Sequence, residues 1–380
     1  MNHKLLLTVL FSLAPLTIST KVQALSLSNR YSNLYVFGDS LSDPGNIFNV
    51  TEAVQPFRDS LGLDIPVTPP VPPYDSDGRF ADSLVWVDFL AQELDLDLIP
   101  STELTPSPIT LTPEPGIDFN YNGATTSNSV NFSYGGAQTG LFGAGGVGTL
   151  IPGVLTQVNT FVADLNQANQ LADDDALAII WGGANDYQIV ADANPEESVQ
   201  NITQAVETLY NVGVRNFLVP NLPDLGNTPR ALLPNPPIAS DVLTQRTNQH
   251  NEFLEDALAD LSLLADIELI SLDPNTLFES ILTNPGDFGF TSLPPNSCLQ
   301  GDPLTTGIAD QIPCNNPDEQ ILWDFIHPST ATHKILADFT VDTIKSQVEP
   351  TSVPEPTPYL PWGFLGIGFC LTRRLYLHRM

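Results

Sequence analysis

The apolar residues of this chain gather in short runs that alternate with longer amphipathic stretches. Five runs have the length and composition of buried β-strands, at 34–37, 130–133, 176–181, 216–219 and 267–272. The stretches between them have helical periodicity, at 84–94, 153–169, 195–211 and 241–264, with a last helix after residue 328. Apolar strands that alternate with helices predict a parallel sheet covered on both faces. We therefore expect an α/β fold with three layers.

Polar or glycine-rich turns follow the first three predicted strands. The strand at 34–37 ends at Gly38, and a polar run at 39–43 follows, where a helix could begin. The second strand leads into Tyr134-Gly-Gly-Ala137, and the third into Gly182-Gly-Ala-Asn-Asp186. In parallel sheets, ligands bind at the carboxyl ends of the strands. We expect the functional site at this edge.

Ser40 is the candidate nucleophile at that edge. A serine that follows a strand and lies near a helix N-terminus has free backbone N–H groups beside it. Such donors stabilise negative charge that develops during a reaction. In the alternative interpretation, Ser40 or Ser42 merely caps a helix. This stretch alone does not separate the two possibilities.

Three histidines lie in the main body of the chain. His250 stands among polar residues on a helix, and we expect it to face solvent. His333 belongs to the last helix and is expected to be structural or exposed. His327 follows Asp324 by three residues, in a loop just before that helix. A carboxylate at this spacing can reach Nδ1 and leave Nε2 free to take a proton from a serine. The alternative is a chance Asp–His pair near a helix start.

Four segments, in this order along the chain, resemble the sequence blocks of the GDSL or SGNH hydrolases. They are Phe37-Gly-Asp-Ser-Leu-Ser-Asp-Pro-Gly-Asn46, Asn131-Phe-Ser-Tyr-Gly-Gly-Ala137, Gly183-Ala-Asn-Asp186 and Asp324-Phe-Ile-His327. The resemblance covers residues 32–346 and departs at Ser133, where relatives often carry alanine. It implies one domain with the SGNH hydrolase fold, a three-layer α/β/α sandwich around a parallel, flavodoxin-like sheet.

The resemblance also implies a role for each site residue. Ser40 would attack an acyl carbonyl, with His327 as general base and then acid, and Asp324 would orient the histidine. The oxyanion would be held by the Ser40 and Gly136 backbone N–H groups and the Asn185 amide, with Gly135 as the alternative to Gly136. Supporting roles fall to Asp39 in the turn, Gly183 in close packing beside Asn185, and Asp186 in bracing the loop. No metal or cofactor is expected.

The same site supports more than one function. Attack by water on the acyl-enzyme gives a carboxylic ester hydrolase, an esterase or lipase, and attack by another alcohol gives an acyltransferase. A third possibility is a catalytically silent protein that binds a surface or an exopolysaccharide. The complete set of site residues favours an enzyme, acting on small-molecule, lipid or acylated-sugar esters. Leu141, Phe142 and Phe288 are expected to line an acyl pocket.

Both ends of the sequence have the composition of targeting signals. Residues 1–24 match a secretory signal peptide, with Lys4, an apolar run and the cleavage site Val22-Gln-Ala24. Residues 347–380 contain a proline-rich spacer, a short apolar segment and a basic tail. This end resembles the PEP-CTERM signal, with Val353-Pro-Glu-Pro356, and implies a sorting protease at the membrane. We expect export to the cell surface or beyond it. The alternatives are a retained N-terminal helix and a weak permanent anchor.

Charge and cysteines agree with a location outside the cell. The net charge is −31, and such an acidic chain repels phosphate backbones, which argues against a nucleic-acid partner. Cys298 and Cys314 flank a loop rich in Gly, Pro and Asp, and in an oxidising compartment they predict one disulfide.

Overall fold

The computed structural model describes residues 27–62, 67–105, 109–110, 116–117, 120–143, 151–300 and 311–348. The expected signal peptide at 1–24 lies outside this part of the chain. So does the expected sorting segment, except for residues 347 and 348 at the end of the last helix. Within the described ranges, no helix combines the length and the apolar character needed to cross a membrane.

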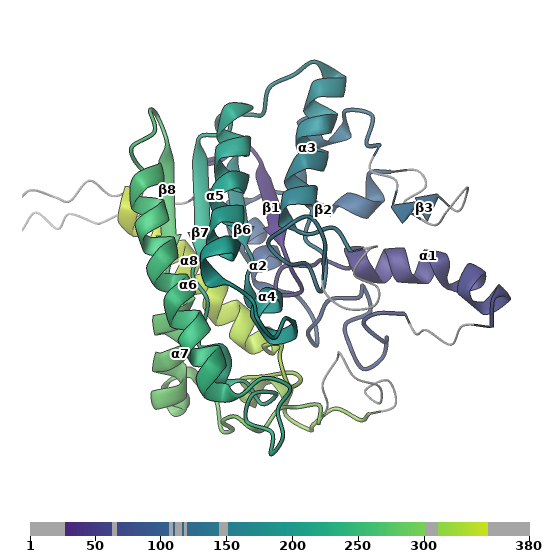
Figure 1. The fold of residues 1–380 in the computed structure, drawn as a ribbon, viewed down its shortest axis with the longest axis vertical. Helices are drawn as coiled ribbons and strands as arrows, with labels where there is room; N and C mark the ends of the chain where they lie inside the picture. Colours follow the sequence, from purple (N-terminus) through teal and green to yellow (C-terminus); the bar gives the residue numbers. More distant parts are fainter. Residues whose placement is uncertain are drawn as a thin grey trace, which may run out of the picture.

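A six-stranded parallel sheet forms the centre of the molecule, in the order β2-β5-β1-β6-β7-β8 (Figure 1). Its strands are β1 (Leu34–Gly38), β2 (Leu98–Pro100), β5 (Ser129–Asn131), β6 (Leu177–Trp181), β7 (Asn216–Pro220) and β8 (Glu268–Leu272). A separate antiparallel pair is formed by β3 (Ile109–Thr110) and β4 (Gly116–Ile117). Without the short edge strand β2, the order is that of a flavodoxin-like sheet, whose ligand site lies where the strand order reverses. That point is between β1 and β6.

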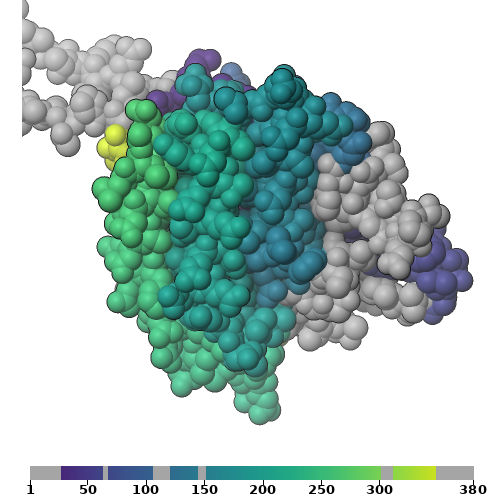
Figure 2. Space-filling model, turned by 45° about the horizontal axis from the view of Figure 1, so that its top comes forward, coloured from purple at the N-terminus to yellow at the C-terminus, as the bar shows by residue number. Residues whose placement is uncertain are grey.

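Helices cover both faces of the sheet. On one face lie α2 (Trp86–Leu94), α7 (Pro274–Thr283) and α8 (Thr330–Val348). On the other lie α3 (Val154–Ala168), α5 (Pro195–Asn211) and α6 (Ser240–Leu261), side by side across the surface in Figure 2. Side chains of β1 alternate between the two faces, so that Val36 packs into the first hydrophobic cluster and Phe37 into the second. The predicted three-layer α/β fold is confirmed.

The first helix begins later than the sequence suggested. The polar run after β1 forms a tight turn, in which the Ser42 N–H donates to the Asp39 carbonyl at 3.0 Å. Helix α1 spans Asn46–Ser60, so neither Ser40 nor Ser42 caps it. Pro44 disfavours helical backbone at the residue before it. The Asp43 carboxylate instead accepts the N–H groups of Gly45 and Asn46, at 2.8 and 2.6 Å.

The prediction that His250 faces solvent is wrong. His250 is fully buried on α6, and its Nδ1 lies 2.7 Å from the Tyr187 hydroxyl. The polar face of α6 packs on the loop after β7, where the Asn251 amide pairs with the N–H and C=O of Leu222, both at 2.9 Å. Buried loop backbone requires hydrogen-bond partners, and the polar side chains of α6 supply them. His333 is also buried.

Candidate active site

Ser40, His327 and Asp324 form a chain of hydrogen bonds. The Ser40 Oγ lies 2.8 Å from His327 Nε2, although the two residues are 287 positions apart. His327 Nδ1 lies 2.7 Å from Asp324 Oδ2. Ser40 comes from the turn after β1, and the other two come from the loop before α8. All three side chains are buried, and the Phe80 ring packs against the imidazole with centroids 4.8 Å apart.

The Asp324 carboxylate accepts four hydrogen bonds. Oδ1 accepts the backbone N–H groups of Ile326 and His327, each at 2.7 Å. Oδ2 accepts from His327 Nδ1 at 2.7 Å and from the Tyr74 hydroxyl at 2.6 Å. The carboxylate therefore closes its own turn and has a fixed orientation. Tyr74 was not identified from the sequence, because it lies 250 positions away in a loop without periodic pattern.

Hydrogen bonds from α3 and β5 hold the turn that carries Ser40. Gln157 of α3 binds both backbone groups of Gly38, accepting the N–H at 2.9 Å and donating to the carbonyl at 2.8 Å. Asn131 of β5 donates to the Ser42 carbonyl at 2.7 Å. These bonds hold the turn from both sides, so the position of Ser40 is set by the sheet rather than by a helix start.

The turn after β5 carries Gly135 and Gly136, at the same edge of the sheet as Ser40. The Gly135 N–H is engaged by the Asp43 carboxylate at 2.6 Å, and a Cβ at Gly135 would lie 2.3 Å from the Phe80 ring. Gly136 has a φ of 81°, which glycine adopts without strain. Between the two glycines, this arrangement favours Gly136 as the oxyanion donor. Asp43 was not identified from the sequence, because its contact with Gly135 spans 92 positions.

Asn185 stands at the start of α4 (Ala184–Ile189), the short helix after β6. Its Nδ2 donates to the Ala137 carbonyl at 2.9 Å and lies 3.5 Å from Asp39 Oδ2. The Asp186 carboxylate accepts the Thr139 N–H at 3.0 Å and the Thr139 hydroxyl at 2.7 Å. Asp186 thus ties the turn after β5 to α4, as a bracing residue would.

Two further carboxyl groups, those of Asp39 and Asp43, are buried near Ser40. Burial raises the pKa of Asp39 to about 7, although the Leu41 N–H donates to its Oδ1 at 3.0 Å. Burial raises the pKa of Asp43 to about 6, against the effect of its backbone donors, the first of which is Gly135. Both groups therefore change charge near neutral pH, and Asp39 does so next to the Asn185 amide.

Gly183 lies in close packing at the end of β6, two residues before Asn185. Its φ is 120°, and a Cβ there would lie 2.9 Å from His250 Cε1 and 3.2 Å from a Leu222 methyl group. The atoms nearest to such a Cβ therefore belong to His250 and Leu222. Burial lowers the pKa of His250 to about 3, so this histidine stays neutral under the site.

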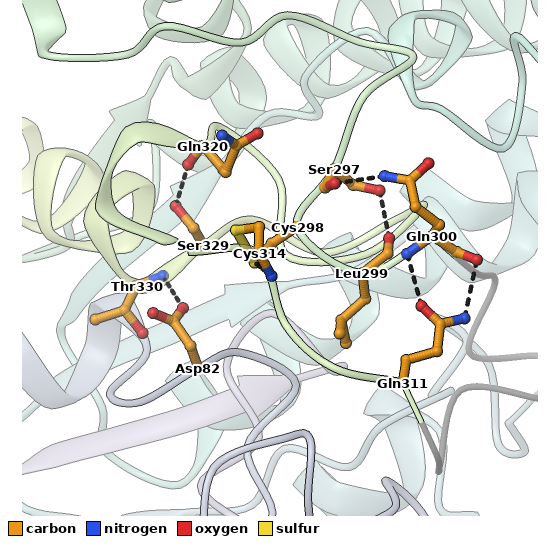
Figure 3. Close-up of a disulfide and its surroundings, with 10 residues drawn as sticks. All are labelled: Asp82, Ser297, Cys298, Leu299, Gln300, Gln311, Cys314, Gln320, Ser329 and Thr330. Atoms are coloured by element: carbon orange, nitrogen blue, oxygen red, sulfur yellow. Dashed lines mark hydrogen bonds between the residues drawn. A yellow bond between two sulfur atoms is a disulfide. The ribbon is translucent and has the colours of Figure 1, made fainter. Parts of the chain in front are cut away.

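The predicted disulfide between Cys298 and Cys314 is present. The Cys298 N–H donates to the Leu322 carbonyl at 3.0 Å, and the Leu299 N–H donates to the Trp323 carbonyl at 2.6 Å. The bridged segment thus runs along the residues just before Asp324. Figure 3 shows two further hydrogen bonds in this region, from the Ser329 hydroxyl to the Gln320 carbonyl and from the Thr330 N–H to the Asp82 carboxylate. Together they brace the loop that carries Asp324 and His327.

The residues expected to line an acyl pocket do not all lie together. Leu141 and Phe142 are exposed on a groove of about 280 Å³, which Gln138, Asp186 and Val190 also line. Gln138 and Asp186 are chain neighbours of Ala137 and Asn185, so the groove adjoins the oxyanion side of the site. Phe288 does not line this groove and packs, half-buried, on the hydrophobic cluster of the α2–α8 face.

Among the residues that the structure describes, one group of carboxylates has the spacing to hold a metal ion. Asp173, Asp174 and Asp175 place ligand oxygens within 4.8 Å of one another. They precede β6, so they lie at the amino edge of the sheet, opposite Ser40. Asp173 already accepts from the Ser32 hydroxyl and the Asn33 amide, at 2.7 and 2.8 Å. This cluster takes no part in the site described above.

Comparison with known proteins places the chain in a family. Residues 34–339 match the model of the GDSL-like lipase/acylhydrolase family. A GDSL esterase/lipase of Arabidopsis thaliana is 28% identical, over 80% of each chain. An acetylajmalan esterase of Rauvolfia serpentina is 27% identical and covers 90% of this chain and 97% of its own. A phosphatidylcholine-sterol acyltransferase of Aeromonas hydrophila is 24% identical and covers 87% of this chain and 96% of its own. The chain belongs to the GDSL-like lipase/acylhydrolase family and is a carboxylic ester hydrolase.

Proposed function

We propose that this protein is an exported serine esterase or lipase that uses Ser40, His327 and Asp324 as its catalytic triad. The observation that carries the proposal is the unbroken chain of hydrogen bonds from the Ser40 Oγ through the imidazole to the Asp324 carboxylate. It lies at the carboxyl edge of the sheet, at the point where the strand order reverses. A nucleophile, a base and a group that orients the base are the parts that acyl transfer requires.

The reaction follows from this geometry. As the Ser40 Oγ attacks the ester carbonyl carbon, His327 Nε2 takes the hydroxyl proton, and Asp324 stabilises the imidazolium. The tetrahedral intermediate collapses, and the alcohol leaves with the proton that His327 returns. Water then attacks the acyl-enzyme with His327 as base. The carboxylic acid is released, and the Ser40 hydroxyl is restored.

Three donors stabilise the negative oxygen of the intermediate in this proposal. They are the backbone N–H groups of Ser40 and Gly136 and the side-chain amide of Asn185. The Asn185 amide has two hydrogens, and the bond to the Ala137 carbonyl at 2.9 Å fixes its direction. The contact with Asp39 at 3.5 Å is long and can be exchanged for the oxyanion. Donors held in place before the reaction stabilise the transition state without reorganisation.

The groove beside the oxyanion donors favours an ester with an apolar acyl part. Leu141 and Phe142 expose apolar surface there, next to the segment that carries Gly136. A panel of p-nitrophenyl esters of increasing chain length, run beside acetylated xylan, tests the substrate class. Rising kcat/KM with chain length supports a lipid or medium-chain ester. Preference for acetyl groups on the polysaccharide supports an acylated sugar.

Acyl transfer to an alcohol is the second candidate. It is favoured by the similarity to the Aeromonas acyltransferase along nearly the whole length of that relative. Product analysis decides between the two: free acid as the product in the presence of an alcohol acceptor supports hydrolysis. A new ester that forms faster than free acid supports transfer.

Export is supported by the disulfide, because disulfides persist in oxidising compartments. The strongly acidic composition is compatible with life outside the cell. We propose that a signal peptidase cuts after Ala24 and that a sorting protease cuts near Pro354–Pro356. Mass spectrometry of the termini of the protein recovered from the cell surface tests both cleavages.

The hydrolytic assignment is tested by a single substitution. Ser40→Ala is expected to abolish cleavage of p-nitrophenyl butyrate and leave the thermal unfolding transition in place, because Ser40 serves the chemistry rather than the fold. Turnover retained by a folded Ser40→Ala variant contradicts the assignment.

A further inference from the structure

Tyr74 forms a hydrogen bond to Asp324 of the triad, and it lies outside the four segments that resemble the family's sequence blocks. It lies in the loop before α2, and 4% of its surface is exposed. Its hydroxyl donates to Asp324 Oδ2 at 2.6 Å, the same oxygen that lies 2.7 Å from His327 Nδ1. A hydrogen bond from a hydroxyl to a buried carboxylate is short and charge-assisted. Tyr74 therefore acts on the carboxylate oxygen that faces the catalytic histidine.

The ring and the hydroxyl of Tyr74 have separable roles. The ring packs edge-on against Phe80 and Trp323, with centroids 6.1 and 6.3 Å away. It also belongs to the hydrophobic cluster that contains Cys298 and Leu299. A phenylalanine at this position keeps these contacts. Only the hydroxyl reaches Asp324, so its removal isolates the hydrogen bond from the packing.

We propose that Tyr74 is a positioning residue whose hydroxyl fixes the Asp324 carboxylate and lowers the negative charge on Oδ2. The proposal rests on the triad proposed above. With the hydroxyl in place, four donors hold the carboxylate and keep Oδ2 directed at the imidazole. Without it, Oδ2 is freer to turn and carries more charge. The extra charge stabilises the protonated imidazole, which cannot act as the base.

His333 and Asp39 are titratable groups that interact electrostatically with His327. Burial lowers the pKa of His333 on α8 to about 3, so it stays neutral throughout the assay range. Burial raises the pKa of Asp39 to about 7, so this group changes charge within the assay range. The Tyr74→Phe variant retains both of these residues. A difference between the pH profiles of the variant and the wild type therefore reports the Tyr74 hydroxyl.

The test is Tyr74→Phe, assayed as full kinetic profiles from pH 5 to 9. We expect kcat/KM to fall about 10-fold, which corresponds to one hydrogen bond to a charged group. The loss lies in kcat, and KM stays within about twofold, because the hydroxyl touches no substrate. The acidic limb of the profile moves up by roughly half a pH unit, since the protonated imidazole is stabilised.

Tyr31→Phe is the matched control. Tyr31 is also buried and its hydroxyl lies 3.4 Å from a carboxylate oxygen, that of Glu268, at the amino edge of the sheet. It is expected to leave the pH profile unchanged. An unshifted acidic limb in Tyr74→Phe overturns the proposal, and so does an equal loss of activity in both variants. A change confined to KM also overturns it.

Reaction with a fluorophosphonate separates this proposal from the one on which it rests. Failure of the wild type to react refutes the serine hydrolase itself. Reaction of the wild type and Tyr74→Phe at the same rate refutes only the role of Tyr74. Slower labelling of Tyr74→Phe, with an unchanged melting temperature, supports it.

Discussion

Asp324 and Asp39, two of the buried carboxyl groups near Ser40, differ in their surroundings. Asp324 accepts four hydrogen bonds and lies against His327. Burial instead raises the pKa of Asp39 to about 7, and its Oδ2 is 3.5 Å from the Asn185 amide. Below pH 7 the neutral form of Asp39 predominates, and no negative charge then stands beside the proposed oxyanion donor. The two carboxyl groups are chemically identical, but their different surroundings suit them to different roles in the proposed mechanism.

The Asn185 amide provides a direct test at the residue scale. Asn185→Ala is expected to lower kcat by about 10²–10³-fold, because one preorganised donor to the oxyanion is lost. KM should change little, since the donor acts mainly on the transition state. Steady-state kinetics on p-nitrophenyl butyrate measure both. Asn296→Ala, in an exposed loop, serves as the control. A kcat that stays within threefold of the wild-type value removes Asn185 from the oxyanion hole.

The site residues that the sequence identified lie in short local patterns. Ser40 follows a strand, and Asp324 precedes His327 by one turn, so the spacing of each was visible in the chain. Tyr74 and Asp43 were missed because their roles depend on contacts across 250 and 92 positions. His250 was misplaced because a polar helix face can be buried when it supplies hydrogen bonds to a loop.

At the element scale, turns and loops carry most of the proposed triad and oxyanion-hole residues, and among these only Asn185 lies in a helix. The strands and the long helices were predictable because their apolar periodicity is strong, and their bounds agree within a few residues. Helix α1 begins later than the sequence suggested and contains Pro56. Two further helices were missed for local reasons, because α4 has six residues and α7 follows β8 after a single intervening residue. Edge strand β2 has only three residues and offers too little pattern to detect.

A substitution at Gly183 tests the account at the element scale. Gly183 is the residue just before α4, and its backbone conformation directs the chain into that helix. Gly183→Ala forces a side chain onto a φ of 120° and places a Cβ 2.9 Å from His250 Cε1. We expect a loss of about 1–3 kcal/mol in the free energy of unfolding, together with a lower kcat. Urea titration and kinetics measure these. Gly286→Ala, where a Cβ meets nothing within 4 Å, should cost less than about 0.5 kcal/mol. Equal stability of the two variants would show that the turn tolerates a side chain.

At the scale of the whole molecule, the parallel sheet brings distant segments to one edge. Turns after β1 and β5 carry Ser40 and Gly136, the start of α4 carries Asn185, and the loop before α8 carries the proposed base, His327. This convergence was predictable because parallel strands all end at the same edge. The details of the final loop were not predictable, since the disulfide segment and Tyr74 hold it through long-range contacts.

The disulfide is expected to stabilise the whole fold. Its loop spans 16 positions and runs beside the residues that precede Asp324. Replacement of Cys298 and Cys314 by serine should lower the free energy of unfolding by about 2–4 kcal/mol. Denaturant unfolding with and without a reducing agent measures the effect. The reducing agent should destabilise the wild type and leave the double variant unchanged. A wild type that is insensitive to reduction contradicts this role.

The buried histidines contribute to the pH dependence of stability, and His333 is the example that a substitution can isolate. Burial lowers the pKa of His333 to about 3, below the value of about 6.5 in an unfolded chain. The unfolded chain therefore binds more protons below pH 6.5, and stability present above that pH is lost as the pH falls. Between pH 7.5 and 5.5, the wild type should lose about 1.4 kcal/mol more than a His333→Gln variant. Urea titrations at the two pH values test this. An equal loss in both proteins would show that His333 is not buried in its neutral form.

The most direct measurement of the central claim is covalent labelling of the purified protein with a fluorophosphonate, followed by peptide mass spectrometry. The wild type should gain one adduct, on Ser40, because His327 activates that hydroxyl across 2.8 Å. His327→Gln should label far more slowly, and Ser40→Ala should not label. A folded wild type that gains no adduct, or gains it on another serine, would contradict the account.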